Sequence, residues 1–242
     1  MELPKSGTAL VAVARFYLRP MRRVLTGGTP RVPGCWGVRL GPTEVAGGQL
    51  VLRSPRMSDG ARWRAVRLAE RERLEPWWIS SSLSWEQRHT EATWVSSWLT
   101  TRRVARAGRA LPLVVEVDGA LAGQCGLDWI ERFTGAGELG IWLDSAVGGR
   151  GIGAVAVAAL VDYAFGVLGL HRVTAPVRTD NEAAARTMQR AGLTREGTMA
   201  AFLDVGGRPR DHDLWAVAAD RVPAGGLVQQ LTVPGQLSGG GS

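Results

Sequence analysis

The residues with the clearest chemical potential lie in the run VGGRGIG, at residues 147–153. Gly149, Gly151 and Gly153 allow the backbone to approach a ligand without interference from a Cβ atom. An apolar run at helical spacing follows, and the first amides of a helix have no acceptors within it. These amides and the helix dipole favour an anion such as a diphosphate, and Arg150 adds a charged donor. A glycine-rich turn before a helix is also a common structural feature, so the loop alone is compatible with both interpretations.

Two common nucleotide-binding patterns are excluded by the residues that follow this loop. A P-loop requires Gly-Lys-Ser/Thr after its glycines, whereas Gly153 is followed by Ala154 and Val155. A dinucleotide fingerprint requires Gly-x-Gly-x-x-Gly and an acidic residue at the end of the next strand. Here the spacing is Gly-x-Gly-x-Gly, and the next predicted strand ends at Arg178.

The segments around the loop predict one mixed α+β domain. Apolar patterns bounded by turns predict strands over residues 36–40, 49–53, 113–117, 121–130, 137–144, 171–177, 193–205 and 211–217. Helical spacing predicts a first helix that begins at the cap at 58–59 and ends at the Pro-Trp-Trp at 76–78. A second helix is predicted over residues 80–109, a third in the apolar run that follows the glycine loop, and a fourth over residues 181–191. Antiparallel hairpins and a strand–loop–helix–strand unit then share one sheet.

Composition and charge exclude several classes of protein. Cys35 and Cys125 are too few for a disulfide framework and lack metal-ligand spacing, so we expect free buried thiols and no metal site. The net charge of +7 is concentrated in residues 1–49, which hold seven Lys/Arg against two Glu, while the remainder holds 22 against 20 acids. No apolar run is long enough for a membrane span, and the run at 9–14 is too short for a signal peptide. We therefore expect a cytoplasmic protein that does not bind membranes.

Three regions are expected along the chain. Residues 1–35 combine scattered arginines with Pro20, Pro30 and Pro33, which indicates a basic, flexible extension. This extension is either a solvated segment or a weak contact for ribosomal RNA. Residues 36–220 form the folded domain. Residues 221–242 are rich in Gly, Ser and Gln, and this composition predicts a disordered tail.

Several motifs follow one another in order between residues 50 and 218. They include the loop glycines, Tyr-Ala-Phe at 163–165, Asn181 at a helix start, Ala-Gly-Leu before Arg-Glu-Gly, and Gly-Arg-Pro-Arg-Asp-His before the last strand. The ordered set resembles the GCN5-related N-acetyltransferases, and among them the branch that acetylates the N-termini of ribosomal proteins. The family's acyl-CoA loop reads Gln/Arg-x-x-Gly-x-Gly/Ala, and Gly151 and Gly153 occupy its two small positions.

The resemblance implies a fold, a co-substrate and a set of contacts. It implies an α+β fold with a mixed, mostly antiparallel sheet of about seven strands and helices on both faces. The strand at 138–143 would splay from the strand at 171–177, and acetyl-CoA would bind between them. The implied contacts are Ile141, Trp142, Leu143, Gly148, Gly149, Arg150, Gly151, Gly153, Ala154 and Asn181. The amine would attack the thioester directly, so neither cysteine is expected to act as a nucleophile.

Three positions depart from the family pattern. The first position of the acyl-CoA loop, Gln or Arg in the family, is Gly148 here, so we expect Arg150 to replace the missing side-chain contact. The serine usual three residues after Asn181 is Ala184, and an acid that some relatives carry before the next strand's aromatic residue is Ala201. These groups act as general acid and base in related enzymes, so the proton-transfer residues stay open.

The candidate bases are carboxylates near the splayed strand. An amine must lose a proton to become a nucleophile, and a group with a pKa near the working pH accepts it best. Glu138 is the first candidate, acting through a chain of water, and the alternative is a structural carboxylate. Asp128 is the second candidate, and Asp204 and His212 follow. No acid that would protonate the leaving thiolate is identified.

Three functions are compatible with these residues. The first is transfer of an acetyl group to the N-terminal α-amine of a protein, as in the branch that the chain resembles. The second is acetylation of a small amine such as an aminoglycoside or a polyamine, although no acidic cluster that would hold such a cation is evident in the sequence. The third is an acyl-CoA sensor without activity. Either a monomer or a homodimer is expected.

Overall fold

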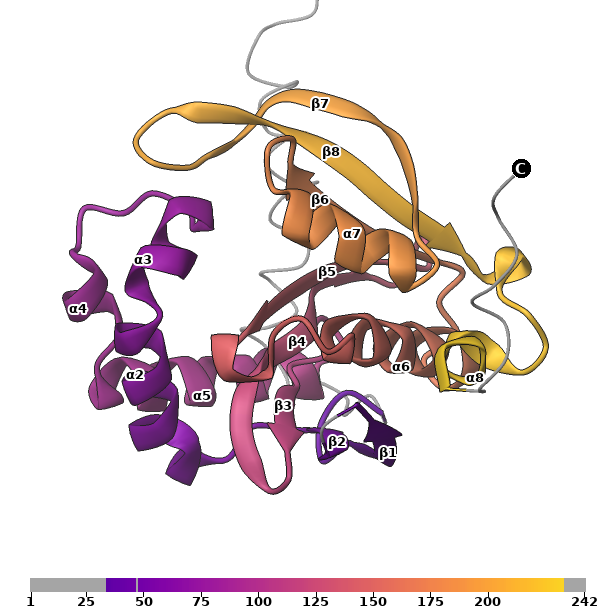
Figure 1. The fold of residues 1–242 in the computed structure, drawn as a ribbon, viewed down its shortest axis with the longest axis horizontal. Coiled ribbons are helices and arrows are strands. Elements are labelled where there is room, and N and C mark those ends of the chain that lie inside the picture. Colours follow the sequence, from indigo (N-terminus) through magenta and orange to yellow (C-terminus); the bar gives the residue numbers. More distant parts are fainter. Residues whose placement is uncertain (1–33, 47, 233–242) are drawn as a thin grey trace, which may run out of the picture.

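The computed structural model describes residues 34–46 and 48–232. In this part of the chain, eight strands form one sheet in the order β1-β2-β3-β4-β5-β6-β8-β7 (Figure 1). They are β1 (Arg39–Val45), β2 (Gly48–Arg53), β3 (Val114–Val117), β4 (Ala120–Glu131), β5 (Ala136–Leu143), β6 (Arg172–Arg178), β7 (Thr194–Asp204) and β8 (Pro209–Ala218). Neighbouring strands are antiparallel except β5 and β6. The mixed α+β sheet is confirmed, with eight strands where about seven were expected.

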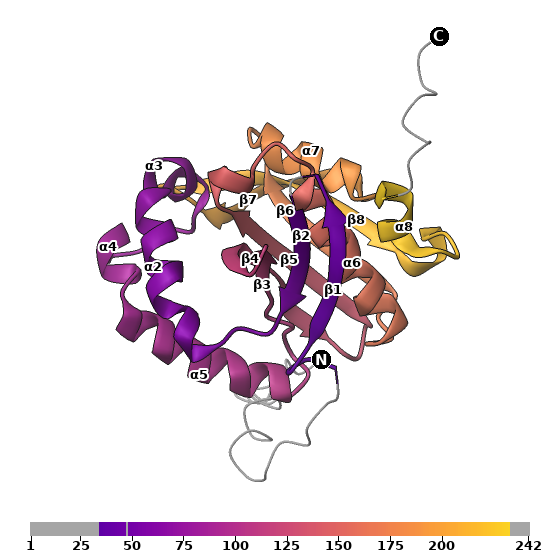
Figure 2. The ribbon, with the colours of Figure 1, turned by 60° about the horizontal axis from the view of Figure 1, so that its bottom comes forward.

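Helices cover both faces of the sheet (Figures 1 and 2). The α6 face carries α6 (Ile152–Gly166), α7 (Glu182–Arg190) and α8 (Gly226–Thr232). The opposite α2–α5 face carries α2 (Gly60–Ala69), α3 (Arg71–Leu74), α4 (Trp85–Arg88) and α5 (Glu91–Arg106). The 3₁₀ turns are η1 (Met57–Asp59), η2 (Glu75–Trp77), η3 (Ser145–Val147) and η4 (Ala219–Arg221).

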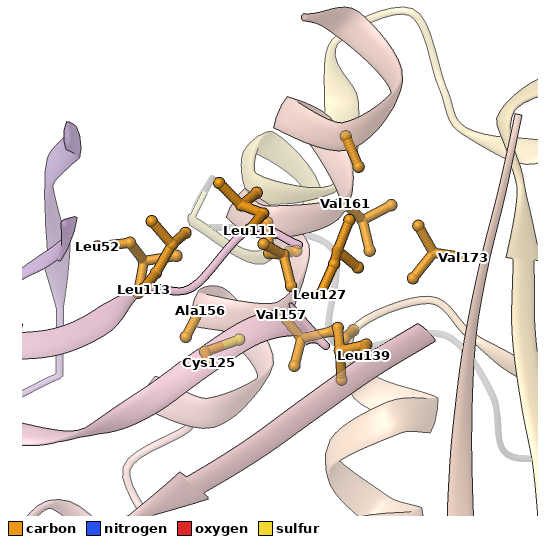
Figure 3. Packing of buried hydrophobic residues seen from close by; sticks show 14 of the residues in the cluster. Leu52, Leu111, Leu113, Cys125, Leu127, Leu139, Ala156, Val157, Val161 and Val173 are labelled. Carbon is orange, nitrogen blue, oxygen red and sulfur yellow. The ribbon is translucent and has the colours of Figure 1, made fainter. Parts of the chain in front are cut away.

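The larger core lies between the sheet and α6 (Figure 3). Ala156, Val157 and Val161 of α6 are fully buried against residues such as Leu127 of β4 and Val173 of β6. Each such Leu or Val contributes about 1.5–3 kcal/mol when it leaves water. Cys125 lies in this core, as predicted. Because α6 is buried along its length, the loop that precedes it is held in a fixed position beside β5.

A second, tryptophan-rich core lies on the α2–α5 face. It contains Trp63, Val66, Leu74, Trp85, Trp94, Val114, Leu121 and Trp142. Indoles of this core also satisfy their donors, since Nε1 of Trp63 and Nε1 of Trp142 both donate to Oε1 of Gln124, at 3.1 and 3.0 Å. Trp85 is fully buried in this core.

Two predicted elements have different bounds in the structure. The first strand continues through Val45, where a turn was predicted, because a bulge between Leu40 and Thr43 accommodates Gly-Pro in this edge strand. The helix predicted over 80–109 is divided into α4 and α5, because Thr90 caps α5 by accepting from the Thr93 amide at 3.0 Å.

Part of the predicted disordered tail is helical. Helix α8 packs its buried Leu227 against the core next to α6. The carboxylate of Asp162, on α6, accepts from the amides of Leu227 at 2.8 Å and Val228 at 3.0 Å, which satisfies donors at the start of α8. The prediction was therefore wrong for residues 226–232, because a tertiary contact offsets their unfavourable composition. Most of the predicted N-terminal extension lies outside the described residues, as do residues 233–242.

Within residues 34–46 and 48–232, no helix combines the length and apolar character that crossing a membrane requires.

Candidate active site

Strands β5 and β6 diverge after three residue pairs. The parallel pairs are Ala136 with Arg172, Gly137 with Val173, and Glu138 with Thr174. Strand β4 remains paired with β5 as far as Leu143, and β8 remains paired with β6 as far as Arg178. The sheet therefore separates into two halves at Glu138, and Leu139–Leu143 has no partner strand on that side. The predicted splay is confirmed.

The glycine loop follows β5 and contains two residues in the left-handed region. Gly149 has φ 74° and Gly151 has φ 78°, a conformation that favours glycine. Gly151 is the N-cap of α6. Within the described chain, the amides of Gly149, Arg150 and Gly151 donate to no acceptor. Ala154 is not an additional free donor, because its amide donates to the carbonyl of Gly151 at 3.0 Å.

Helix α7 lies beside this loop and brings a cation to it. A Cβ atom on Gly153 would lie 3.2 Å from Cγ2 of Thr187, and one on Gly151 would lie 3.1 Å from Nη2 of Arg190. Among the described residues, the Arg190 guanidinium makes no ion pair or hydrogen bond. A cation at a helix N-terminus is unfavourable unless an anion accompanies it. The only sequence signal for Arg190 is a basic residue in the last turn of a helix, which is common.

The other predicted contact residues differ in which of their groups remain available to a ligand. Asn181 caps α7, with Oδ1 accepting from the Ala184 amide at 3.1 Å. The Gly148 amide donates to the carbonyl of Ser145 at 2.9 Å, and the exposed Arg150 side chain makes no ion pair or hydrogen bond in the described structure. The Trp142 side chain is buried in the core of the α2–α5 face, so only its backbone is available along β5.

Asp128 is the extra residue of a bulge in β4. Leu127 pairs with Leu139 and Trp129 with Glu138, so no residue of β5 lies directly opposite Asp128. A bulge can redirect a side chain within a sheet. The carboxylate lies over Gly140, where a Cβ atom would be 2.5 Å from Oδ2 of Asp128. The bulge thus brings a carboxylate to the point at which β5 leaves β6.

Asp128 and Glu138 interact electrostatically. Burial, with a further contribution from the Glu138 charge, raises the pKa of Asp128 to about 6. Burial also raises the pKa of Glu138. Asp128 is solvent-exposed as a residue, while enough protein atoms lie near its carboxylate for desolvation to raise its pKa. A carboxylate with this pKa is ionised at neutral pH and is suited to accept a proton.

The two weaker candidates lie elsewhere. The Asp204 carboxylate accepts from Ser80 Oγ at the far end of β7, and His212 is buried, with Nδ1 at 2.9 Å from the carbonyl oxygen of Arg210. His212 pairs with Arg178, at the opposite end of β6 from Thr174. The fold therefore does not bring these residues together with Asp128 and Glu138. Over residues 34–46 and 48–232, no group of three His, Cys, Asp or Glu side chains could hold a metal ion.

A buried arginine lies next to Trp142 on the α2–α5 face. The guanidinium carbon of Arg67 is 3.8, 4.6 and 4.9 Å from the ring centroids of Trp78, Trp85 and Trp142. Its Nε donates to Nε2 of His89 at 3.0 Å. Burial lowers the pKa of Arg67 to about 9, and the three rings offset part of the cost of burying the cation. The sequence contains no local signal for this cluster, because its members come from distant segments.

Comparison with known proteins finds a family model and solved structures that this chain resembles. Residues 49–194 match the family model described as acetyltransferase (GNAT) domain. The structure of Mycobacterium smegmatis RimJ in complex with CoA-disulfide is similar, with a TM-score of 0.78 and 34% identity over 81% of this chain and 94% of that chain. The ribosomal-protein-S5-alanine acetyltransferase from Vibrio fischeri is also similar, with a TM-score of 0.67 and 26% identity over 77% of this chain and 100% of that chain.

Matches among curated proteins are shorter. "Probable N-acetyltransferase YjcK" of Bacillus subtilis is 38% identical over 79 residues, which are 33% of this chain and 44% of that protein. The chain spans about half the length of the curated relatives that it matches.

Proposed function

The chain belongs to the GNAT acetyltransferase family, and on this premise we propose that it transfers the acetyl group of acetyl-CoA to the N-terminal α-amine of a protein. The observation that carries the proposal is the divergence of β5 from β6 directly before a loop with three unpaired amides. A free strand edge and a cluster of donors fit the amide-bearing arm and the diphosphate of one ligand. Similarity to M. smegmatis RimJ and to the V. fischeri enzyme supports the protein acceptor.

The residues present fit an acyl-CoA, which supplies an activated thioester when bound. The edge of β5 from Ile141 to Leu143, which no strand pairs on the β6 side, would hold the pantetheine arm, and the Leu143 carbonyl on it already accepts a hydrogen bond from the Arg73 side chain. The amides of Gly149, Arg150 and Gly151 would hold the diphosphate, because the left-handed glycines leave no Cβ atom in the way. The side chains of Arg150 and Arg190 would add charge-assisted contacts, and the Asn181 amide group remains available as a donor.

Asp128 is the base in this proposal. Its carboxylate lies over Gly140, beside the point where the strands separate, and its pKa of about 6 leaves it ionised at neutral pH. Asp128 accepts one proton from the acceptor ammonium, directly or through one water, so that the amine nitrogen can attack the thioester carbon. The carbon–sulfur bond then breaks, and the second amine proton leaves to the thiolate or to solvent. Glu138 acts through its charge, which raises the pKa of Asp128.

The acceptor would enter from the α2–α5 face. Along β5, Leu139 faces the core beneath α6, whereas Trp142 faces the tryptophan-rich core. Because side chains alternate along a strand, Glu138 and Gly140 face the same side as Trp142. Asp128 therefore also lies on this side, opposite the buried helix α6.

The proposal is tested by measuring thiol release from acetyl-CoA with a library of peptides that carry free N-termini. Turnover on free peptides, no turnover on the same peptides with a blocked N-terminus, and an acetyl group on the α-amine by mass spectrometry are expected. Asp128→Asn should retain acetyl-CoA binding and lose turnover. Turnover restricted to polyamines or aminoglycosides would contradict the protein acceptor, and acetyl-CoA binding without turnover on any amine would contradict the enzymatic activity.

A further inference from the structure

A cavity of about 360 Å³ lies beyond the end of β6, next to the start of β8. Five charged side chains line it, namely Arg178, Asp180, Arg208, Arg210 and Asp211. Three arginines thus face two aspartates, in a chain segment that the proposed proton transfer does not use. The lining residues therefore carry a net positive charge, and none of them has a part in the proposed proton transfer.

Arg178 forms a fixed wall of this cavity. Its Nε and Nη2 atoms donate to the two carboxylate oxygens of Asp180 at 2.5 and 2.8 Å, and Nη1 donates to the carbonyl of Pro76 at 2.6 Å. Its guanidinium carbon lies 4.1 Å from the ring centroid of Trp77. The pairing with Arg178 lowers the pKa of Asp180, so this carboxylate is ionised at neutral pH and engaged with Arg178.

In the described chain, neither of the other two arginines makes a direct ion pair with a carboxylate, although the Arg210 charge contributes to the lowered pKa of Asp180. Nε of Arg210 donates to the carbonyl of Val205 at 3.2 Å, and the exposed Arg208 side chain makes no ion pair or hydrogen bond. The Asp211 carboxylate already accepts from the amide of Ala201 at 2.8 Å. Because a neutral amide does not cancel the charge of a carboxylate, Arg208, Arg210 and Asp211 together contribute one net positive charge to the cavity, and the Arg208 guanidinium is the group whose donors are free.

The distance between this cavity and the candidate base Asp128 can be covered by a short extended peptide. Thr174 lies opposite Glu138, and Arg178 follows four residues later on β6. At about 3.3 Å per residue, this separation is roughly 13 Å. An extended peptide whose amine is at Asp128 would cover it in about four residues. Arg178 also contacts η2, which follows α3 on the α2–α5 face of the sheet. The Asp128 and Glu138 carboxylates lie on this same face.

We propose that this cavity binds an acidic side chain of the acceptor protein, at about the third to fifth residue after the acetylated amine. This inference rests on the proposed function, because the proposed function places the reacting amine at Asp128. A carboxylate fits the net positive charge of this cavity, and the free donors of Arg208 would bind it in charge-assisted hydrogen bonds. A polyamine or an aminoglycoside would be repelled by the net positive charge of the lining residues. The cavity thus favours acceptors with an acidic N-terminal segment.

The test uses peptides that are identical except for Glu, Gln or Lys at residues three to five. The kcat/KM and the calorimetric Kd are measured for the wild-type protein, Arg208→Gln, Arg208→Glu and the control Arg221→Gln. Arg208 is exposed and unpaired, so its substitution should leave the fold intact, and Arg221 follows the other end of β8. We expect the wild-type protein to prefer Glu over Gln by about two- to fivefold, as for a solvent-exposed ion pair. Arg208→Gln should remove this preference, Arg208→Glu should favour Lys, and Arg221→Gln should retain the wild-type preference.

The outcomes separate this inference from the proposed function. Turnover of peptides with equal kcat/KM for Glu and Gln would overturn the acidic site and leave the proposed function intact. A Glu preference that Arg208→Gln and Arg208→Glu do not change would also overturn the assignment of this cavity. Binding that prefers Glu and depends on Arg208, without turnover of any peptide, would support the cavity and overturn the proposed function. Neither binding nor turnover of any peptide would overturn both.

Discussion

Oδ2 of Asp128 lies so close to the Cα atom of Gly140 that a Cβ atom on Gly140 would be 2.5 Å from it. The contact exists because β4 carries a bulge at Asp128, which directs the carboxylate over the neighbouring strand. Gly140 is only two residues beyond Glu138, the last residue of β5 that pairs with β6. The lack of a side chain at residue 140 thus permits a carboxylate at the opening between the strands.

Gly140→Ala should impair the chemical step. The added methyl group would displace the Asp128 carboxylate, and a displacement of about 1 Å can reduce the rate by roughly 10²-fold. We expect kcat to fall by about this factor, with little change in the KM for acetyl-CoA. Gly166→Ala is a matched control, because its Cβ atom would have no neighbour within 4 Å. A Gly140→Ala enzyme with the kcat of the wild type would contradict a role for the position of this carboxylate.

The pH dependence of kcat should identify the base. Asp128 must be ionised to accept a proton, so kcat should rise with pH through its pKa of about 6 and then level off. Glu138→Gln removes a negative charge that raises this pKa, so the rise should move to lower pH while the plateau is retained. Asp128→Asn should lower the plateau by about 10²- to 10⁴-fold. The opposite result, a lost plateau in Glu138→Gln and a retained one in Asp128→Asn, would identify Glu138 as the base.

The loop glycines allow backbone strain to be separated from a side-chain contact. Gly149→Ala and Gly151→Ala both place alanine at a positive φ, but only the second brings a Cβ atom to 3.1 Å from Arg190. Gly151→Ala should therefore raise the KM for acetyl-CoA more than Gly149→Ala does. Arg190→Gln should raise it by about fivefold through loss of an exposed charge-assisted contact. In a double-mutant cycle, Gly151→Ala and Arg190→Gln should be less than additive, and full additivity would contradict the contact.

His89 should make the folded state sensitive to acid. Burial, with a contribution from the Arg67 charge, lowers the pKa of His89 from 6.5 to about 4, so the folded state binds fewer protons than the unfolded state. The resulting stability is present above pH 6.5 and is lost as the pH falls toward about 4. His89→Gln can keep an acceptor for Arg67 and a donor to the carbonyl of Trp85 without titrating. The decrease in the free energy of unfolding between pH 7.5 and pH 5, measured in urea, should be smaller in this variant, and an equal decrease would exclude His89 as its source.

The glycine loop and the strands around it could be predicted because their signals are local. Gly151 and Gly153 mark a turn before an apolar helix, and the alternating residues of β5 and β6 mark strands. The ranking of Asp128 and Glu138 could not be predicted in the same way. Whether Asp128 lies in a bulge depends on the register between β4 and β5, and two strands of suitable pattern can pair in more than one register.

The sequence by itself determined the family, the mixed sheet, the position of the glycine loop and the burial of Cys125, because each depends on a short pattern or on an ordered series of motifs. Only the tertiary structure decided which charges act together. Arg190 reaches Gly151 from the end of another helix, and Arg208 shares a cavity with Arg178, about thirty residues earlier in the chain. Helix α8 likewise forms where composition predicts disorder, because Asp162 of a distant helix satisfies its first amides. Electrostatic and packing energies depend on distance in space, and separation along the chain does not report that distance.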